Sequence, residues 1–189
     1  MYHGAISHTP IQTAYGCLFC LTGREQQLAA GINQANVGIR ATAVHQIKRF
    51  TKRGVTVPRE EIVLKGYVLF EAPVHCPVQE LLPLGETASV LYYTDGAWQL
   101  YGEDEAYTRW VFKYGGVIRM SRAHRTGDHI TIIDGPLKDM EKRIVRMDRR
   151  NRSGQVSVTF GGKAFKFWLG YELIEECGPY AQALASCGE

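Results

Sequence analysis

The sequence predicts an α+β protein of two domains: an N-terminal antiparallel sheet with helices, followed by a small five-stranded β-barrel. Three observations indicate this architecture. Two helical patterns interrupt strand-like runs before residue 117, four short β-rich runs follow residue 120, and basic charge gathers in that second part. A chain of 189 residues has room for one domain or two small ones.

The composition is that of an ordinary globular protein. Apolar residues make up 45% of the chain and charged residues 22%, close to the usual quarter. These values exclude a disordered or low-complexity chain. No run approaches the ~20 apolar residues of a membrane helix, and no apolar run marks a signal peptide. We therefore expect a cytoplasmic protein with no membrane contact, a flexible leader over 1–14 and a poorly ordered tail over 177–189.

The cysteines do not form a pattern typical of disulfides or zinc. Their number, five, is odd and their spacing irregular. Cys17 and Cys20 form one C-x-x-C pair, but a zinc site needs a second pair of ligands. We interpret them as small residues on a buried strand in a reducing compartment, and we expect no metal site.

The N-terminal part begins with a strand that leads directly into a helix. Residues 15–21 form a short apolar and aromatic run, which suits a buried strand. Thr22 and Glu25 have the spacing of a capping box, and apolar residues then recur at helical spacing up to Gly38. The pattern predicts an amphipathic helix of about three turns.

A β-rich stretch and a second helix complete this part. The β-rich runs cover 41–50, 55–64, 67–70 and 89–94, and turn residues separate them. Three acids at 103–105 then suit a helix N-terminus. The apolar face of that helix comprises Tyr107, Trp110, Val111 and Tyr114, and Gly115 and Gly116 end it. The order β-α-β-β-β-β-α predicts an α+β domain over 15–118.

The second part is basic and has no helical period. Residues 121–170 contain eleven Lys and Arg against five Asp and Glu. Its β-rich runs cover 130–133, 143–147, 156–160 and 164–168, and residues 173–174 can close a fifth strand. A closed barrel hides the edges of so small a sheet. We expect a short linker over 119–126 and the barrel over 127–176.

In their order, these motifs resemble the NusG family of transcription elongation factors. The resemblance rests on the strand before Thr22-Gly23-Arg24-Glu25, on Gly66-Tyr67-Val68-Leu69, and on Gly127–Ile132 with Gly135–Lys138 as a KOW signature. It covers residues 15–176 and implies a NusG-type N-terminal domain followed by an SH3-like KOW barrel. The basic stretch 148–152 and the short linker most resemble the LoaP group of specialised paralogues.

The sequence departs from the family pattern at several positions. Asp139 and Lys142 occupy the KOW loop where the family usually has glycines, which tolerate positive φ more easily. Tyr15 replaces the usual Trp of the first strand, and Lys65 replaces a proline. We expect the KOW loop to differ in shape or in partner.

The resemblance implies that an apolar sheet face binds the clamp helices of the largest RNA polymerase subunit. Carried over by position, this face includes Phe19, Tyr67 and Leu69. Alternation puts Tyr67 and Leu69 on one side of a strand, so Val68 and Phe70 should pack under the helices. The alternative is that the first three residues belong to the core.

A basic hairpin tip at 48–53 surrounds an aromatic residue. Such a tip is able to contact nucleic acid, which makes non-template DNA a candidate partner. The alternative, which we favour, is a solvated turn.

The barrel carries the stronger nucleic-acid signal. Its cations lie within about thirty residues: Lys138, Lys142, Arg143, Arg146, Arg149, Arg150, Arg152, Lys163 and Lys166. A cationic loop on a small barrel is able to bind an RNA groove. We expect a monomeric antitermination factor that binds RNA polymerase and a nascent RNA hairpin. The first alternative is a general NusG-like adaptor whose barrel binds a ribosomal or termination protein.

No pattern for catalysis is present. The chain lacks a phosphate-binding G-x-x-x-x-G-K-[ST] loop, a G-x-S-x-G elbow and an H-E-x-x-H helix, and its six histidines are scattered. We expect neither enzymatic activity nor a cofactor. An enzyme on a similar α+β scaffold remains the alternative from another functional class.

Overall fold

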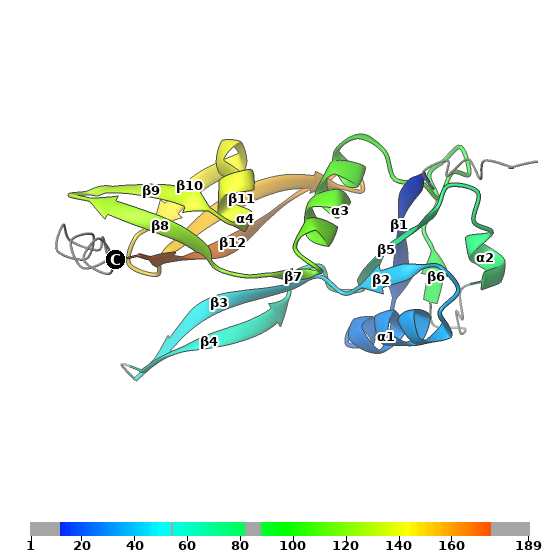
Figure 1. Ribbon diagram of the computed structural model, residues 1–189, viewed down its shortest axis with the longest axis horizontal. Helices are drawn as coiled ribbons and strands as arrows, with labels where there is room; N and C mark the ends of the chain where they lie inside the picture. Colours follow the sequence, from blue (N-terminus) through cyan, green and yellow to red (C-terminus); the bar gives the residue numbers. More distant parts are fainter. Residues whose placement is uncertain (1–11, 54, 82–87, 175–189) are drawn as a thin grey trace, which may run out of the picture. The chain divides into compact units, whose positions relative to one another are not determined.

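A computed structural model describes residues 12–53, 55–81 and 88–174 of the chain (Figure 1). The expected tail lies outside these residues, as does the expected leader up to residue 11. The α+β class is confirmed, since most elements are strands and few are helices. The chain divides into two compact units, which we call unit 1 (residues 1–44 and 62–116) and unit 2 (residues 45–61 and 117–189).

Unit 1 is built on a four-stranded sheet with the order β2-β5-β1-β6. Its strands are β1 (Thr13–Cys20), β2 (Arg40–Thr42), β5 (Tyr67–Pro73) and β6 (Ala88–Val90). β1 lies in the centre and pairs antiparallel with β5 and β6. The last strand is shorter than the run predicted for 89–94.

One face of this sheet packs against α1 (Glu25–Ala35), which Figure 1 shows beside the sheet. Val68 and Phe70 are buried there together with Ala29 and Ile32 of the helix. This confirms that Val68 and Phe70 pack under a helix. The short helix α2 (Val78–Leu81) adds Val78 to the same core.

The helix α1 begins in a way that the capping-box pattern does not describe. Its N-cap is Arg24, which makes no side-chain cap, so Thr22 is not the N-cap. The carboxylate of Glu25 instead accepts hydrogen bonds from the backbone N–H groups of Gly23 and Gly66, each at 2.7 Å. Glu25 is completely buried, so the bond to Gly66 ties the start of α1 to the start of β5.

The helix α3 (Gly102–Lys113) has the acidic first turn that the sequence predicts. Its Tyr107, Trp110 and Val111 are buried. The ring of Phe112 lies 5.6 Å from the ring of Tyr15 on β1, measured between centroids. α3 therefore contacts the sheet through β1.

Unit 2 contains a five-stranded sheet with the order β10-β11-β12-β8-β9. Its strands are β8 (Ser121–Thr126), β9 (His129–Asp134), β10 (Ile144–Asp148), β11 (Ser153–Phe160) and β12 (Lys163–Leu173). Between β9 and β10 lie the short helix α4 (Pro136–Asp139) and the 3₁₀ turn η1 (Glu141–Arg143). Five strands are thus present, with β9 and β10 as the outer two, while closure into an SH3-like KOW barrel stays a prediction.

The fifth strand differs from the one that the sequence suggested. Most of the expected linker 119–126 is strand β8, whose Ser121 and Ala123 are buried. β8 pairs in parallel with the end of β12, so residue 173 ends β12 and forms no separate strand. The linker prediction missed this strand because its buried residues are small and lie between charged ones.

A second, three-stranded sheet in unit 2 has the order β4-β3-β7. It comprises β3 (His45–Lys52), β4 (Val55–Ile62) and β7 (Val117–Ile118). The run 41–50 is split because β2 pairs with β5, whereas β3 pairs with β7. Residues 45–61, which we expected within the domain 15–118, therefore group with unit 2.

Among the helices that the structure describes, none is long and apolar enough to span a membrane.

Candidate functional site

The cations predicted to bind RNA all lie in unit 2, between α4 and β12. Lys138 is on α4, Lys142 and Arg143 are on η1, Arg146 is on β10, Arg149, Arg150 and Arg152 are in the β10–β11 turn, and Lys163 and Lys166 are on β12. Most are exposed, and Arg143 and Arg152 are half-buried. Lys138 forms an ion pair with Glu141 at 2.7 Å.

The strand register decides which of these cations share a face. Phe167 and Leu169 of β12 point into the core, so Lys166 and Trp168 lie on the opposite face. Gln155 is paired with both Trp168 and Arg146, which places Arg146 in the same row. The structure thus brings Arg146, Lys166 and Trp168 together on one side of the sheet.

Lys163 is separated from the arginines of the β10–β11 turn. It pairs with Phe160 at one end of the β11–β12 ladder, while Ser153 beside the turn pairs with Gly170 at the other end. Seven residues of strand span about 20 Å. A single compact interface would therefore include the turn and Arg146 more readily than Lys163.

The β10–β11 turn has a fixed shape. The carboxylate of Asp148 accepts hydrogen bonds from the backbone N–H of Asn151 at 2.9 Å and from its side-chain amide at 2.8 Å. These bonds lower the pKa of Asp148, so the carboxylate is ionised at neutral pH. Arg152 has a left-handed φ of 48°, and its carbonyl accepts the backbone N–H of Tyr171 at 2.9 Å. Arg149 and Arg150 thus extend from a turn held at both ends.

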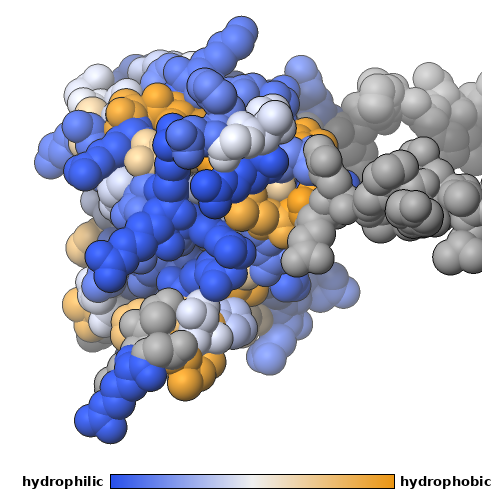
Figure 2. All heavy atoms as spheres, turned by 90° about the vertical axis from the view of Figure 1, so that its left-hand side faces the viewer, coloured by the Kyte–Doolittle hydropathy of each residue, from blue (hydrophilic) through white to orange (hydrophobic). Residues whose placement is uncertain are grey.

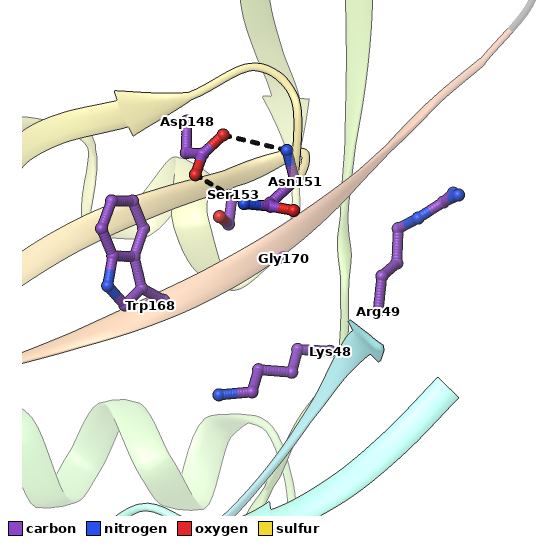
Figure 3. A pocket seen from close by; sticks show the side chains of 7 residues that line it. All are labelled: Lys48, Arg49, Asp148, Asn151, Ser153, Trp168 and Gly170. Atoms are coloured by element: carbon purple, nitrogen blue, oxygen red, sulfur yellow. Dashed lines mark hydrogen bonds between the residues drawn. The ribbon is translucent and has the colours of Figure 1, made fainter. Parts of the chain in front are cut away.

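A pocket of about 300 Å³ lies beside this turn (Figure 3). It is lined by Lys48 and Arg49 of β3, by Asp148, Asn151 and Ser153 around the turn, and by Trp168 and Gly170 of β12. Sequence reasoning missed this grouping, since it placed the hairpin and the barrel in different domains. The basic run 48–53 was the feature of the sequence that could have indicated a contribution of β3 to this site.

The amine of Lys48 is positioned by an acidic neighbour. It forms an ion pair with Glu61, whose carboxylate also accepts a hydrogen bond from the amide of Gln46 at 2.5 Å. Partial burial opposes ionisation of Glu61, but the hydrogen bonds from Lys48 and Gln46 outweigh it and lower the pKa. The Lys48 amine is therefore oriented by the Glu61 carboxylate.

The β3–β4 hairpin exposes both apolar and basic groups. The guanidinium of Arg59 lies 5.1 Å from the centre of the Phe50 ring. Val55 and Val57 are also exposed. Figure 2 shows the end of unit 2 with the β8–β9 and β3–β4 turns, where hydrophilic groups dominate and hydrophobic patches lie among them. Within the predicted basic tip 48–53, the side chains of residues 51 and 52 lie outside what the structure describes, as does the adjoining residue 54.

Only two of the three residues predicted to bind polymerase reach the surface. Phe19 is 46% exposed, and its ring packs edge-on against half-buried Tyr67 with 5.8 Å between centroids. Leu69 is 0% exposed and therefore belongs to the core, in line with the alternative that we kept open. Strand alternation places Leu69 on the same side of β5 as Tyr67, but it cannot show which other residues cover that side.

Further exposed apolar side chains in unit 1 are Leu21, Tyr92 and Tyr101. Leu21 follows Phe19 by two residues and lies just beyond the end of β1. The ring of Tyr101 packs at a tilt against that of Tyr93 with 4.2 Å between centroids, and the hydroxyl of Tyr93 donates to Asp104 at 2.8 Å. Sequence reasoning did not select these residues.

The cysteines lie as the strand interpretation predicts. Cys17 and Cys20 are free thiols buried on β1, and burial raises the pKa of Cys17. Within residues 12–53, 55–81 and 88–174, no three His, Cys, Asp or Glu side chains gather in a group that could hold a metal ion.

No protein-family profile and no curated protein matches the chain. Among solved structures, the chain is similar to one described as "Domain interaction in Thermotoga maritima NusG". The sequence identity is 16% and the TM-score 0.43, and the match covers 84% of this chain and 94% of the other.

Proposed function

We propose that the protein is a transcription elongation and antitermination factor of the NusG type, which binds RNA polymerase through unit 1 and a nascent RNA hairpin through unit 2. The observation that carries this proposal is the ordered β10–β11 turn that exposes Arg149 and Arg150, next to a strand whose Arg146 shares a cross-strand row with Trp168. Guanidinium groups and an aromatic ring on one surface are the groups that RNA-binding proteins use for phosphates and bases. The motif order of the sequence supports the same assignment.

In this proposal, exposed Phe19 and half-buried Tyr67 bind the clamp helices of the largest polymerase subunit. Aromatic side chains that are partly exposed and already ordered make good interface anchors. Leu69 supports this surface from the core. The β3–β4 hairpin, with Phe50 and Arg59, is available to non-template DNA.

The protein would act in the cytoplasm as a monomer, without a cofactor and without chemistry of its own. Its effect would be read-through of terminators in operons whose leader RNA carries the recognised hairpin. Recruitment by RNA would thus decide where the polymerase-binding unit acts.

A second function, that of a general adaptor whose unit 2 binds a ribosomal or termination protein, is favoured by one observation. Ile133 on β9 and Val145 on β10 are exposed apolar side chains on the two outer strands of the sheet. Outer strands with exposed apolar groups suit a protein partner. Binding of an RNA hairpin requires Arg149, Arg150 and Arg152, whereas binding of a protein through the outer strands does not.

Fluorescence polarisation of labelled leader hairpins at about 150 mM salt, where nonspecific phosphate binding is weakened, tests the proposal. We expect the full chain to bind a few hairpins tightly, and the triple variant Arg149→Ala, Arg150→Ala, Arg152→Ala to lose that binding. A matched triple variant in unit 1, with Arg24, Lys65 and Arg109 replaced by alanine, removes three exposed cations and should retain it. Weak and equal binding to all hairpins would favour the adaptor.

A single-round transcription assay tests the read-through step. A template that encodes a bound hairpin upstream of a terminator should yield more read-through product with the full chain than without it. The triple variant should give the level without protein. Equal read-through on a template without the hairpin would remove the role of RNA recruitment.

A further inference from the structure

The pocket beside the β10–β11 turn has properties that the binding of an RNA stem does not use. It is a concave space of about 300 Å³ in unit 2 (Figure 3), at the lower end of the usual range of small-molecule sites. A base-paired stem is too wide to enter such a space. A single nucleotide is of the right size.

One wall of the pocket is an aromatic ring. Trp168 is half-buried and lies on the face of β12 away from the core, because its neighbours Phe167 and Leu169 are buried. Trp168 is paired across the sheet with Gln155 of β11. An ordered indole that is partly exposed is a stacking platform for an unpaired base of any type.

A second wall supplies positive charge. Figure 3 shows the Lys48 side chain extending toward the side of Trp168, while Arg49 points the other way. Lys48 is held by Glu61, whereas Arg49 has neither an ion pair nor a hydrogen bond to any residue that the structure describes. Lys48 therefore supplies a cation on the side of Trp168 and Arg49 a second cation at another edge of the pocket, and both can attract the phosphates of a nucleic-acid strand.

The third wall carries hydrogen-bonding groups. The Asp148 carboxylate is ionised and oriented by Asn151, and each of its oxygens retains further capacity to accept a hydrogen bond. Ser153 adds a hydroxyl group beside it. Carboxylates accept hydrogen bonds from the exocyclic amino group of cytosine. Uracil has no amino group and offers Asp148 only its ring N–H.

We infer that this pocket receives one unpaired nucleotide of RNA, with its base stacked on Trp168, an amino group of the base donating to Asp148, and the adjoining phosphates near Lys48 and Arg49. The inference rests on the proposed function, because it names the part of the RNA that the pocket takes. A bulged or looped-out nucleotide would enter the pocket, while the adjoining stem contacts Arg149 and Arg150 of the β10–β11 turn.

Titration of the ¹⁵N-labelled full chain with mononucleotides tests the pocket by itself. The indole N–H resonance of Trp168 is assigned as the one missing in Trp168→Phe and is followed by NMR, with those of Trp98 and Trp110 as internal references. We expect the Trp168 resonance to shift and saturate with 5′-CMP, several-fold more tightly than with 5′-UMP. Ribose 5-phosphate should leave it unchanged. An equal response to ribose 5-phosphate, or no response to CMP, would overturn the inference.

Two synthetic hairpins that differ only in one bulged cytidine test the pocket within RNA. The full chain should bind the bulged hairpin about tenfold more tightly, and Trp168→Ala should abolish this difference. Phe165→Ala is the matched control, since Phe165 lies on the same strand, stacks on Phe167 on the opposite face, and should keep the preference. Trp168→Phe retains an aromatic face and should keep part of the preference for the bulged hairpin. Circular dichroism verifies that each variant is folded.

The two proposals fail in distinguishable ways. If both hairpins bind equally, Trp168→Ala changes neither, and the triple arginine variant loses both, then the nucleotide pocket is refuted and the RNA-binding function stands. If neither hairpin binds while CMP still shifts Trp168, then the pocket stands as a nucleotide site and the RNA-recruited function is refuted.

Discussion

The carboxylate of Glu25 accepts a hydrogen bond of 2.7 Å from the backbone N–H of Gly66, 41 residues further along the chain. Its other oxygen accepts the N–H of Gly23 at the same distance. One buried carboxylate thus satisfies two backbone donors from separate segments. This contact ties the first turn of α1 to Gly66, the residue that directly precedes β5 and half-buried Tyr67.

Replacing Glu25 with alanine should destabilise unit 1 strongly. The change leaves the buried N–H of Gly66 without an acceptor and removes the acceptor of the exposed Gly23 N–H, at a cost of about 1–3 kcal/mol in the free energy of unfolding. Urea denaturation followed by circular dichroism measures it. Glu105→Ala, which removes a more exposed carboxylate paired with Arg109, should cost less than about 1 kcal/mol. Equal losses in the two variants would contradict the role of Glu25.

Leu69 and Phe19 should separate stability from polymerase binding. Leu69→Ala opens a cavity in the core and should lower the free energy of unfolding by about 2–5 kcal/mol. Phe19→Ala removes a side chain that is 46% exposed and should cost less than about 1.5 kcal/mol. Under the proposed function, Phe19→Ala should nevertheless weaken binding to RNA polymerase in a pull-down assay. Retained polymerase binding by a folded Phe19→Ala protein would place the docking surface elsewhere.

Gly16 is required by the ring of Phe70 on the paired strand. A Cβ atom at position 16 would lie 2.1 Å from Cζ of Phe70, far inside contact distance. Gly16→Ala should therefore cost about 1–3 kcal/mol of stability through overpacking. The double variant Gly16→Ala, Phe70→Leu should be more stable than the sum of the single changes predicts, which a double-mutant cycle in urea measures. Additive losses would mean that the two positions do not compete for space.

Glu61 should make stability depend on pH in the acidic range. Although partial burial opposes ionisation, hydrogen bonds from Lys48 and Gln46 lower its pKa below the ordinary value of 4.5. A group with a depressed pKa in the folded state stabilises the fold above its unfolded pKa, and this contribution disappears as the pH falls through the folded value. Thermal melts of the wild type and Glu61→Gln should thus differ most at neutral pH and converge below about pH 4. A constant gap from pH 7 to pH 3 would show that the ion pair with Lys48 contributes nothing.

The arginines of the β10–β11 turn should control the salt dependence of RNA binding. Each phosphate contact contributes roughly 0.7–0.9 to the slope of log K against log salt. The triple variant of Arg149, Arg150 and Arg152 should therefore bind with a slope smaller by about two to three. Polarisation titrations at four salt concentrations give the slope. An unchanged slope with weaker binding would indicate that the three arginines act through the shape of the turn.

Much of the local structure could be predicted from residue patterns. The apolar run at 15–21, the acidic turn at 103–105 and the strands after residue 128 all appear near their expected places, since period and turn chemistry act locally. One strand was not predicted. β8 was overlooked because its buried residues, Ser121 and Ala123, are small and carry little hydrophobic signal.

The candidate sites were predictable in part. Alternation identified which side of β5 carries Tyr67 and Leu69, and charge counting identified the basic segment that includes Arg149 and Arg150. That Leu69 is completely buried depends on what packs over the sheet, and no periodicity within one strand reports on that. The nucleotide pocket was not predictable, because Lys48 and Trp168 are far apart in sequence.

By itself, the sequence determined the class of the elements, their order and the concentration of basic charge after residue 120, because these follow from propensity, spacing and composition. Only the tertiary structure decided that β3 groups with the second unit and that Lys48 faces the same pocket as Trp168. The physical reason is that strand pairing between distant segments, such as β3 with β7 and β12 with β8, depends on the packing of the whole unit and on no local pattern.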